Sequence, residues 1–339
     1  MFQSEFGAQL RHLTLELAFD AATFTSEAAK TLERIGSTME GLQSLSISLL
    51  PRPSPSSAAG KTETGVPKLP LLSTSIRKSD LLLLGPLLEL IGQLPQQMTN
   101  LSAFSLAVDV VSAEIADLDG HLDFLETLSR FTRAKSLSLT LYGDLKAMES
   151  CPALKLNFEH LRQNRKLKKF SLDCAKTSDV DIERLVRACP QLTELSLGVD
   201  VRVTGSTLVD QISRHLSDLQ KLEVHQSYGS LMAPTDRKTS ARTLPTSKEA
   251  LFIDSDALAS FLLSAPLSLP RLRSVTFENC RIDMEDLKVL DVLVTFASHQ
   301  PEQLFSISLA HNRFPLTVVP KYRAKYQDYL PTNLTLSWR

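Results

Sequence analysis

Seven charged or imidazole side chains, from the middle of the chain onward, have the residue types and spacing for molecular recognition. They stand at alternating positions of short apolar segments: Lys169, Asp173, Glu194, Lys221, Glu223, His225 and Glu278. Opposite charges set side by side steer a charged partner and select it more than they add raw affinity. These residues are therefore the candidate binding site. The alternative is that these seven side chains form a solvated face that binds no partner.

Motifs for nucleotide, metal or nucleophilic chemistry are incomplete or missing. Gly60-Lys61-Thr62 resembles the end of a phosphate-binding loop, but Pro55 occupies the position where the loop needs its first glycine. The sequence contains no G-x-S-x-G, no H-E-x-x-H and no C-x-x-C, and its histidines are scattered singly. We therefore expect no catalytic residues, no cofactor and no metal site. A catalytic triad assembled from distant segments is the alternative that spacing alone leaves open.

The composition restricts the partners. Lys and Arg number 37 against 38 Asp and Glu, so the basic excess of a duplex-binding surface is missing and we expect no nucleic-acid partner. The longest apolar run, near residues 81–91, is interrupted by Gly85, Pro86 and Glu89. It is too short to cross a bilayer, so we expect no membrane partner. With no signal peptide and no paired cysteine spacing, we expect free thiols in a reducing compartment, cytoplasmic or nuclear.

An internal repeat predicts the elements that position these side chains. Segments 272–282 and 304–314 both fit L-x-x-L-x-L-x-x-[NC]-x-L, with an apolar residue in each leucine slot. Weaker copies begin at Leu10, Leu42, Leu101, Ala134, Leu167, Leu192, Leu219 and Pro331. Self-similarity at such a period is typical of stacked repeat architectures.

The geometry of the repeat predicts the fold. The fourth and sixth motif positions alternate along a short strand, so both side chains point to one face. Helical patterns follow at 26–39, 81–94, 118–131, 180–188, 206–216, 255–263 and 284–296. One repeat cannot bury its apolar face alone, so repeats must stack. We predict an α/β solenoid, a horseshoe with a parallel inner sheet and outer helices. It forms a single domain over 1–339 with insertions at about 51–77 and 227–250.

In each predicted strand, one residue lies between the two core positions, and its side chain points into the concavity of this solenoid. Nine of the ten residues in that slot carry a hydroxyl: Thr14, Ser46, Ser105, Ser138, Ser171, Ser196, Thr276, Ser308 and Thr335, with Glu223 as the exception. Small polar side chains suit the crowded inside of a curved sheet, and a hydroxyl stripe that contacts a partner is the second interpretation. The seven charged residues lie in the middle of the same arc.

The repeats resemble the leucine-rich-repeat superfamily. Their helix-containing length and the cysteine variant at Cys280 are closest to the ribonuclease-inhibitor-like and F-box-associated subclasses. The resemblance implies a non-enzymatic module that binds another protein on its concave face. One form is the substrate-recognition subunit of an F-box-type ubiquitin ligase with a Skp1-like adaptor. The alternatives are a standalone scaffold or inhibitor and, less favoured, a GTPase-activating protein. An F-box would precede the repeats, and none is seen because the first repeat begins at Leu10. The F-box-type interpretation therefore implies either an F-box encoded upstream of this sequence or an adaptor bound by another surface.

Two segments of the chain are rich in basic residues. The run over 162–169 is predicted to follow the end of a helix, where the helix dipole favours cations. The hydroxyl-rich and basic segment 227–248 is either a tolerated insertion or a kinase target beside the binding face.

Overall fold

The structure, a computed structural model, describes most of the central chain and parts of the remainder. These residues are 10–19, 24–39, 41–51, 84–109, 122–142, 154–199, 203–227, 252–253, 260–261, 265, 268–278, 281–282, 291–292, 294–295, 305–308 and 334–337. The predicted insertions at 51–77 and 227–250 lie outside the described residues, apart from Pro51 and Ser227.

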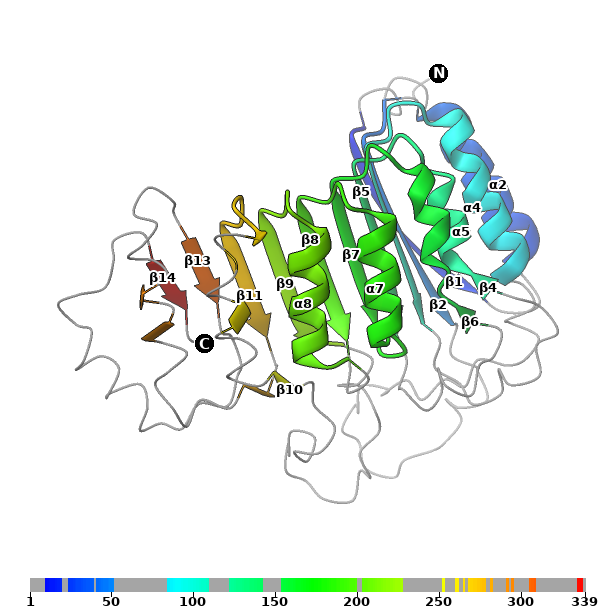
Figure 1. Cartoon of the computed structure of the whole chain (residues 1–339). Coiled ribbons are helices and arrows are strands. Elements are labelled where there is room, and N and C mark those ends of the chain that lie inside the picture. The colour runs from blue at the N-terminus through cyan, green and yellow to red at the C-terminus, as the bar shows by residue number, and fades with distance from the viewer. Residues whose placement is uncertain are drawn as a thin grey trace, which may run out of the picture.

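The ten predicted repeats contribute ten strands to one sheet. The strands are β1 (His12–Phe19), β2 (Ser44–Pro51), β3 (Ala103–Asp109), β5 (Ser136–Tyr142), β7 (Lys169–Cys174), β8 (Glu194–Val199), β9 (Lys221–Gln226), β11 (Ser274–Glu278), β13 (Phe305–Ser308) and β14 (Leu334–Ser337). They lie in chain order, and each pairs with the next in parallel (Figure 1). The predicted α/β solenoid with a parallel inner sheet is therefore confirmed. β2 pairs directly with β3, and β9 with β11, although a long segment separates each pair in sequence.

The register of the last strand differs from the prediction. Ser308 pairs with Ser337, and Ser306 pairs with Thr335. A last motif that begins at Pro331 predicts that Thr335 lies opposite Ser308. In the structure, the residues of this motif pair as if it began two residues later along the chain. The side-chain period of a strand is two, so a shift of two residues preserves the apolar pattern and escapes detection from sequence.

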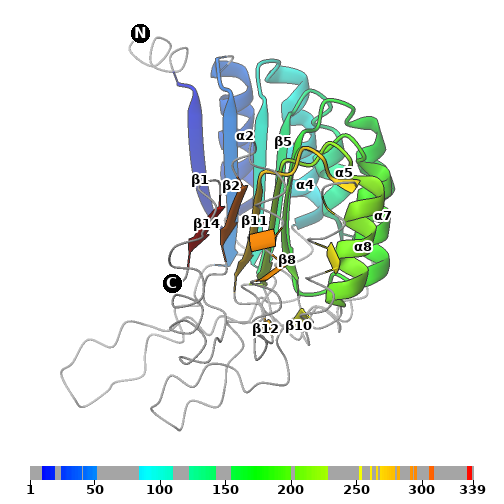
Figure 2. The same cartoon turned by 60° about the vertical axis from the view of Figure 1, so that its left-hand side comes forward.

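The helices cover one face of the sheet and lie on the outer side of its curve (Figure 2). They are α2 (Phe24–Thr38), α4 (Leu84–Gln97), α5 (Phe124–Ser129), the 3-10 helix η3 (Phe158–Gln163), α7 (Asp179–Ala188) and α8 (Gly205–His215). Two small sheets pair β4 (Leu122–Asp123) with β6 (Leu154–Lys155) and β10 (Phe252–Ile253) with β12 (Arg281–Ile282). None of the helices described in the structure is long and apolar enough to cross a membrane.

Helix positions follow the predicted pattern closely where the chain is described. Helices predicted at 26–39, 81–94, 180–188 and 206–216 begin and end within three residues of α2, α4, α7 and α8. α5 is shorter than the predicted 118–131 because residues 122–123 pair as a strand before it begins. Of the helices predicted at 255–263 and 284–296, only 260–261 and four residues between 291 and 295 are described, and these are helical.

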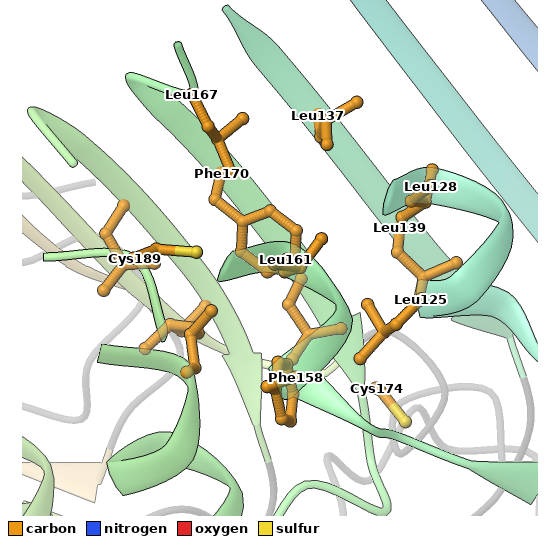
Figure 3. Packing of buried hydrophobic residues seen from close by; sticks show 14 of the residues in the cluster. Leu125, Leu128, Leu137, Leu139, Phe158, Leu161, Leu167, Phe170, Cys174 and Cys189 are labelled. Atoms are coloured by element: carbon orange, nitrogen blue, oxygen red, sulfur yellow. The ribbon is translucent and has the colours of Figure 1, made fainter. Parts of the chain in front are cut away.

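The core lies between the sheet and the helices and follows the alternation of the strands. In β5, Leu137, Leu139 and Leu141 are buried while the residues between them are half-buried. Behind them, Leu125 and Leu128 of α5 occupy the same layer (Figure 3). The strands from β2 to β11 in this sheet thus bury one face, and the opposite face is left to solvent or to a partner.

The described cysteines belong to this core. Cys174 and Cys189 are buried free thiols, as predicted. Burial raises the pKa of the Cys174 thiol to about 11 and that of Cys189 to about 12. Both thiols are therefore protonated at neutral pH and serve as small apolar side chains.

Candidate functional site

The face of the sheet opposite the helices, the concave face, carries three rows of side chains in register. The first row is His12, Ser44, Ala103, Ser136, Lys169, Glu194, Lys221 and Ser274; the middle row is Thr14, Ser46, Ser105, Ser138, Ser171, Ser196, Glu223 and Thr276; the third row is Glu16, Ser48, Ala107, Thr140, Asp173, Gly198, His225 and Glu278. Small residues occupy β2, β3 and β5, and charges gather on β7, β8, β9 and β11. The seven predicted site residues, the mid-arc cluster, therefore lie on four adjacent strands (Figure 1).

Two half-exposed ion pairs form the centre of the mid-arc cluster. Lys169 Nζ lies 2.7 Å from Glu194 Oε1 on the neighbouring strand, and Lys221 Nζ lies 2.7 Å from Glu223 Oε1 on its own strand. The hydrogen bond to Glu223 raises the pKa of Lys221, so this ammonium stays charged at neutral pH. Pairs as exposed as these contribute at most about 1 kcal/mol to stability. They are thus better suited to recognition than to holding the fold.

A shallow hollow opens between the two ion pairs. Its volume is about 210 Å³, and its lining comes from β5, β7, β8 and β9: Ser136, Lys169, Phe170, Ser171, Glu194, Leu195, Ser196, Lys221 and Glu223. Cations, carboxylates and hydroxyls thus converge on one depression in the concave face. Such a surface fits a partner segment that presents both hydrogen-bonding groups and charge.

Asp173 and His225 approach each other across β8 because Gly198 lies between them. Nε2 of His225 lies 3.7 Å from Oδ2 of Asp173, an ion-pair distance for a protonated imidazole but too long for a hydrogen bond. A Cβ atom on Gly198 would lie 2.5 Å from Asp173 Oδ1 and 2.6 Å from His225 Nε2. Only glycine therefore allows this arrangement without displacing one of the two side chains.

Ser227, the residue that follows β9, fixes the Asp173 carboxylate. Its Oγ donates a 2.6 Å hydrogen bond to Asp173 Oδ1, and its backbone N–H donates to the carbonyl of Val199. Asp173 is only 4 % exposed and Ser227 is fully buried. Of the predicted site residues, Asp173 is thus the one placed to orient its neighbours instead of contacting a partner directly.

Ser227, His225 and Asp173 bring together the residue types of a hydrolytic triad in a different arrangement. In a triad the serine hydroxyl is hydrogen-bonded to the imidazole, which removes its proton. Here the Ser227 hydroxyl donates to the carboxylate and is enclosed in protein. This geometry supports a structural role for the serine and leaves no activated nucleophile at the group.

Sequence reasoning found the strands of the site but missed two of its parts. Gly198 carries no charge and belongs to no motif, so no pattern singled it out. Ser227 is the first residue of the predicted insertion at 227–250, but the structure buries it and bonds it to Asp173, so the insertion begins after it. A signal did exist for Gly198, because glycine inside a strand often marks a close approach of neighbouring groups. Among the described residues, no group of histidine, cysteine or acidic side chains has the arrangement of a metal site.

Comparisons with known proteins add little to this description. No protein-family model matches the sequence, and no curated protein matches it. Among solved structures, the leucine-rich-repeat-containing protein LegL7 from Legionella pneumophila aligns with 96 % of this chain and 91 % of its own, at 13 % identity and a TM-score of 0.42. A chain of the yeast Rad7 and Elc1 complex aligns with 97 % of this chain and 81 % of its own, at 13 % identity and a TM-score of 0.28.

The chain's own repeats and the parallel pairing of its strands define its class of fold. Ten short parallel strands lie in chain order, and the apolar motif positions from β2 to β11 are buried, so the chain is an α/β solenoid built from L-x-x-L-x-L repeats. In this class the open face of the sheet is the broadest surface available to a partner.

Proposed function

We propose that the chain is a protein-interaction module whose concave face binds another protein through the mid-arc cluster: Lys169, Asp173, Glu194, Lys221, Glu223, His225 and Glu278. One observation carries the proposal. Charges of both signs converge on the 210 Å³ hollow between β5 and β9, whereas the hydroxyls and alanines of β2 and β3 present no comparable group. A binding face needs such a local concentration of specific contacts.

The exposed fraction of each side chain in the mid-arc cluster indicates its role in binding. Lys169, Glu194 and Lys221 have side chains that are 35 to 54 % exposed, so they can exchange their present ion pairs for bonds to a partner. A charged partner approaching them is selected by complementarity, since like charges brought together on a face are repelled. Asp173 lies 3.7 Å from the imidazole of His225 behind these contacts, in the space that Gly198 leaves open.

The specific form that we propose is the substrate-recognition subunit of an F-box-type ubiquitin ligase, joined to the ligase by a Skp1-like adaptor. This form is supported by the resemblance of the helix-containing repeats to F-box-associated repeats. A standalone scaffold or inhibitor uses the same concave face, but no ligase subunits accompany its partner. The two forms therefore predict different sets of co-purifying proteins.

Affinity purification of the tagged chain from its native cells, followed by quantitative mass spectrometry, tests the proposal. The test variant is Lys169→Glu with Lys221→Glu, and the control variant is Lys30→Glu with Arg184→Glu, an equal charge change on exposed helix positions. We expect recovery of the principal partner to fall at least about tenfold for the test variant only. Equal recovery by both variants contradicts the proposed site. Ligase subunits beside the partner support the specific form, and a single stoichiometric partner without them supports a scaffold or inhibitor.

A further inference from the structure

A second surface, away from the concave face, gathers exposed cations from two neighbouring loops. The loop between α5 and β5 supplies Arg133 and Lys135, and the loop between η3 and β7 supplies Arg165, Lys166 and Lys168. All five side chains are exposed. β5 and β7 are adjacent in the sheet, so the two loops lie side by side where these strands begin, at the upper edge of the sheet in Figure 1. We call these five residues the strand-start rim.

Hydrogen bonds hold the two loops rigidly together. The backbone N–H groups of Lys168 and Lys169 both donate to the carbonyl of Lys135, at 2.8 and 2.9 Å. Beneath them, Nδ2 of the buried Asn164 donates to the carbonyl of Phe131 at 3.0 Å. These hydrogen bonds fix the backbone that carries the cations. A ligand that binds them therefore does not have to order either loop.

The positive charge of the strand-start rim is not compensated within the part of the chain that the structure describes. The nearby carboxylates are engaged by other cations: Glu89 and Glu126 by Arg130, Glu159 by Arg162, and Glu194 by Lys169. None of the five rim side chains has an ion pair among the described residues, and Lys168 Nζ donates to the carbonyl of Gln191. The flanking loops at 98–102 and 189–193 contain no acidic residue. Five like charges on one edge therefore attract an anion.

A partly apolar hollow of about 250 Å³ adjoins the cations on the same edge. It lies between the loop that precedes β3 and the loop that precedes β5, and its lining is Pro95, Gln96, Met98, Thr99, Leu101, Arg130, Phe131, Thr132, Arg133 and Ala134. Arg133 belongs to both the hollow and the rim. A cavity of about 150 Å³ holds a benzene molecule, so this hollow has room for one leucine or aromatic side chain.

From this juxtaposition we propose that the strand-start rim binds an acidic polypeptide segment, with carboxylates on the five cations and one apolar side chain in the adjoining hollow. The observations favour a peptide over a nucleic acid for two reasons. Single-stranded nucleic acids stack on exposed aromatic rings, and Val180 is the only large apolar side chain exposed among the described residues. The cations also span only two repeats, which is a short track for a phosphate backbone.

The test uses the full chain and a fluorescein-labelled oligoglutamate peptide with one central leucine, followed by fluorescence anisotropy. The rim variant replaces Arg133, Lys135 and Lys166 with glutamine. The control variant makes the same replacement at Lys30, Arg34 and Arg184, which are exposed cations on helices. We expect the rim variant to bind the peptide about tenfold more weakly or worse, because three charged contacts are lost. The control variant should bind within about twofold of the parent chain.

Two further measurements complete the test. A peptide with glycine in place of leucine should bind about fivefold more weakly to the parent chain if the hollow is used. A labelled oligothymidylate of matched charge should bind more weakly than the peptide. The proposal is overturned if the parent chain does not bind the peptide at physiological salt, if rim and control variants weaken equally, or if the oligothymidylate binds more tightly than the peptide. The concave-face variant Lys221→Gln should bind the peptide within about twofold of the parent chain, which separates this surface from the mid-arc cluster.

Discussion

At the scale of single residues, Gly198 has the largest expected effect on the mid-arc cluster. A methyl group there would meet Asp173 and His225 at under 3 Å, so Gly198→Ala must displace one of them. We expect this variant to lose about 1 to 3 kcal/mol of unfolding free energy in urea denaturation, the usual range for overpacking. Gln93→Ala, at an exposed position of α4, is the control and should change the unfolding free energy by less than about 0.5 kcal/mol. Unchanged stability of Gly198→Ala would show that the two side chains are not packed as described.

The buried cysteines give a second prediction at this scale. With pKa values raised to about 11 and about 12 by burial, Cys174 and Cys189 hold about a thousandth or less of their thiols as thiolate at pH 8. We expect iodoacetamide to leave both unmodified in the native chain and to label both after denaturation, as read by peptide mass spectrometry. Rapid native labelling of either cysteine at pH 8 would contradict the burial that the structure assigns to it.

The sequence predicted single residues well where a repeated position defines them. The alternation of each motif placed Lys169, Glu194 and Lys221 on the concave face, because a strand has only two faces to choose from. The partnership of Ser227 with Asp173 joins residues 54 positions apart and depends on the curvature of three strands, which no local pattern contains. The convergence of Arg133 and Lys135 with the 165–168 loop escaped prediction for the same reason.

At the scale of elements, α7 shows how the sequence begins a helix. Ser178 accepts a hydrogen bond from the backbone of Asp181, and the Asp181 side chain accepts from the backbone of Ser178. This reciprocal capping box satisfies N–H groups that the first helical turn leaves open. We expect Ser178→Ala to reduce the unfolding free energy by about 1 kcal/mol. Ser217→Ala, at an exposed turn position, should change it by less than about 0.5 kcal/mol; equal losses would contradict the cap.

Helices were predictable from the sequence where they are long enough to show the helical period. α2, α4, α7 and α8 span ten residues or more, enough for apolar positions to recur on one face. η3 is a 3-10 helix of six residues, too short to show a period, and the basic run over 162–169 was the one indication that a helix ends there. The two-residue strands of the small sheets were missed because pairing between neighbouring loops has no pattern of its own.

At the scale of the whole molecule, stability comes from contacts between successive repeats. β9 and β11 pair over five residues although residues 227–273, including the segment 228–251, separate them in sequence. We propose that the chain is one domain and that this segment adds no layer to it. Replacing residues 230–246 by a short glycine-serine linker should therefore keep the unfolding transition cooperative and shift Tm by no more than a few degrees, since loop length affects stability weakly. Loss of the transition, monitored by circular dichroism, would mean that the segment supports the stack.

The central claim, that a protein partner lies against the middle of the concave face, is tested most directly by site-specific photocrosslinking in native cells. A photoreactive phenylalanine is placed at Ser138, on the strand beside the mid-arc cluster, and in a separate variant at Arg184, on the helical face. The account predicts a covalent adduct from position 138 that contains the principal partner of the purification experiment, and none from position 184. An adduct of that partner from position 184 alone would contradict the account and move the binding surface to the outside of the solenoid.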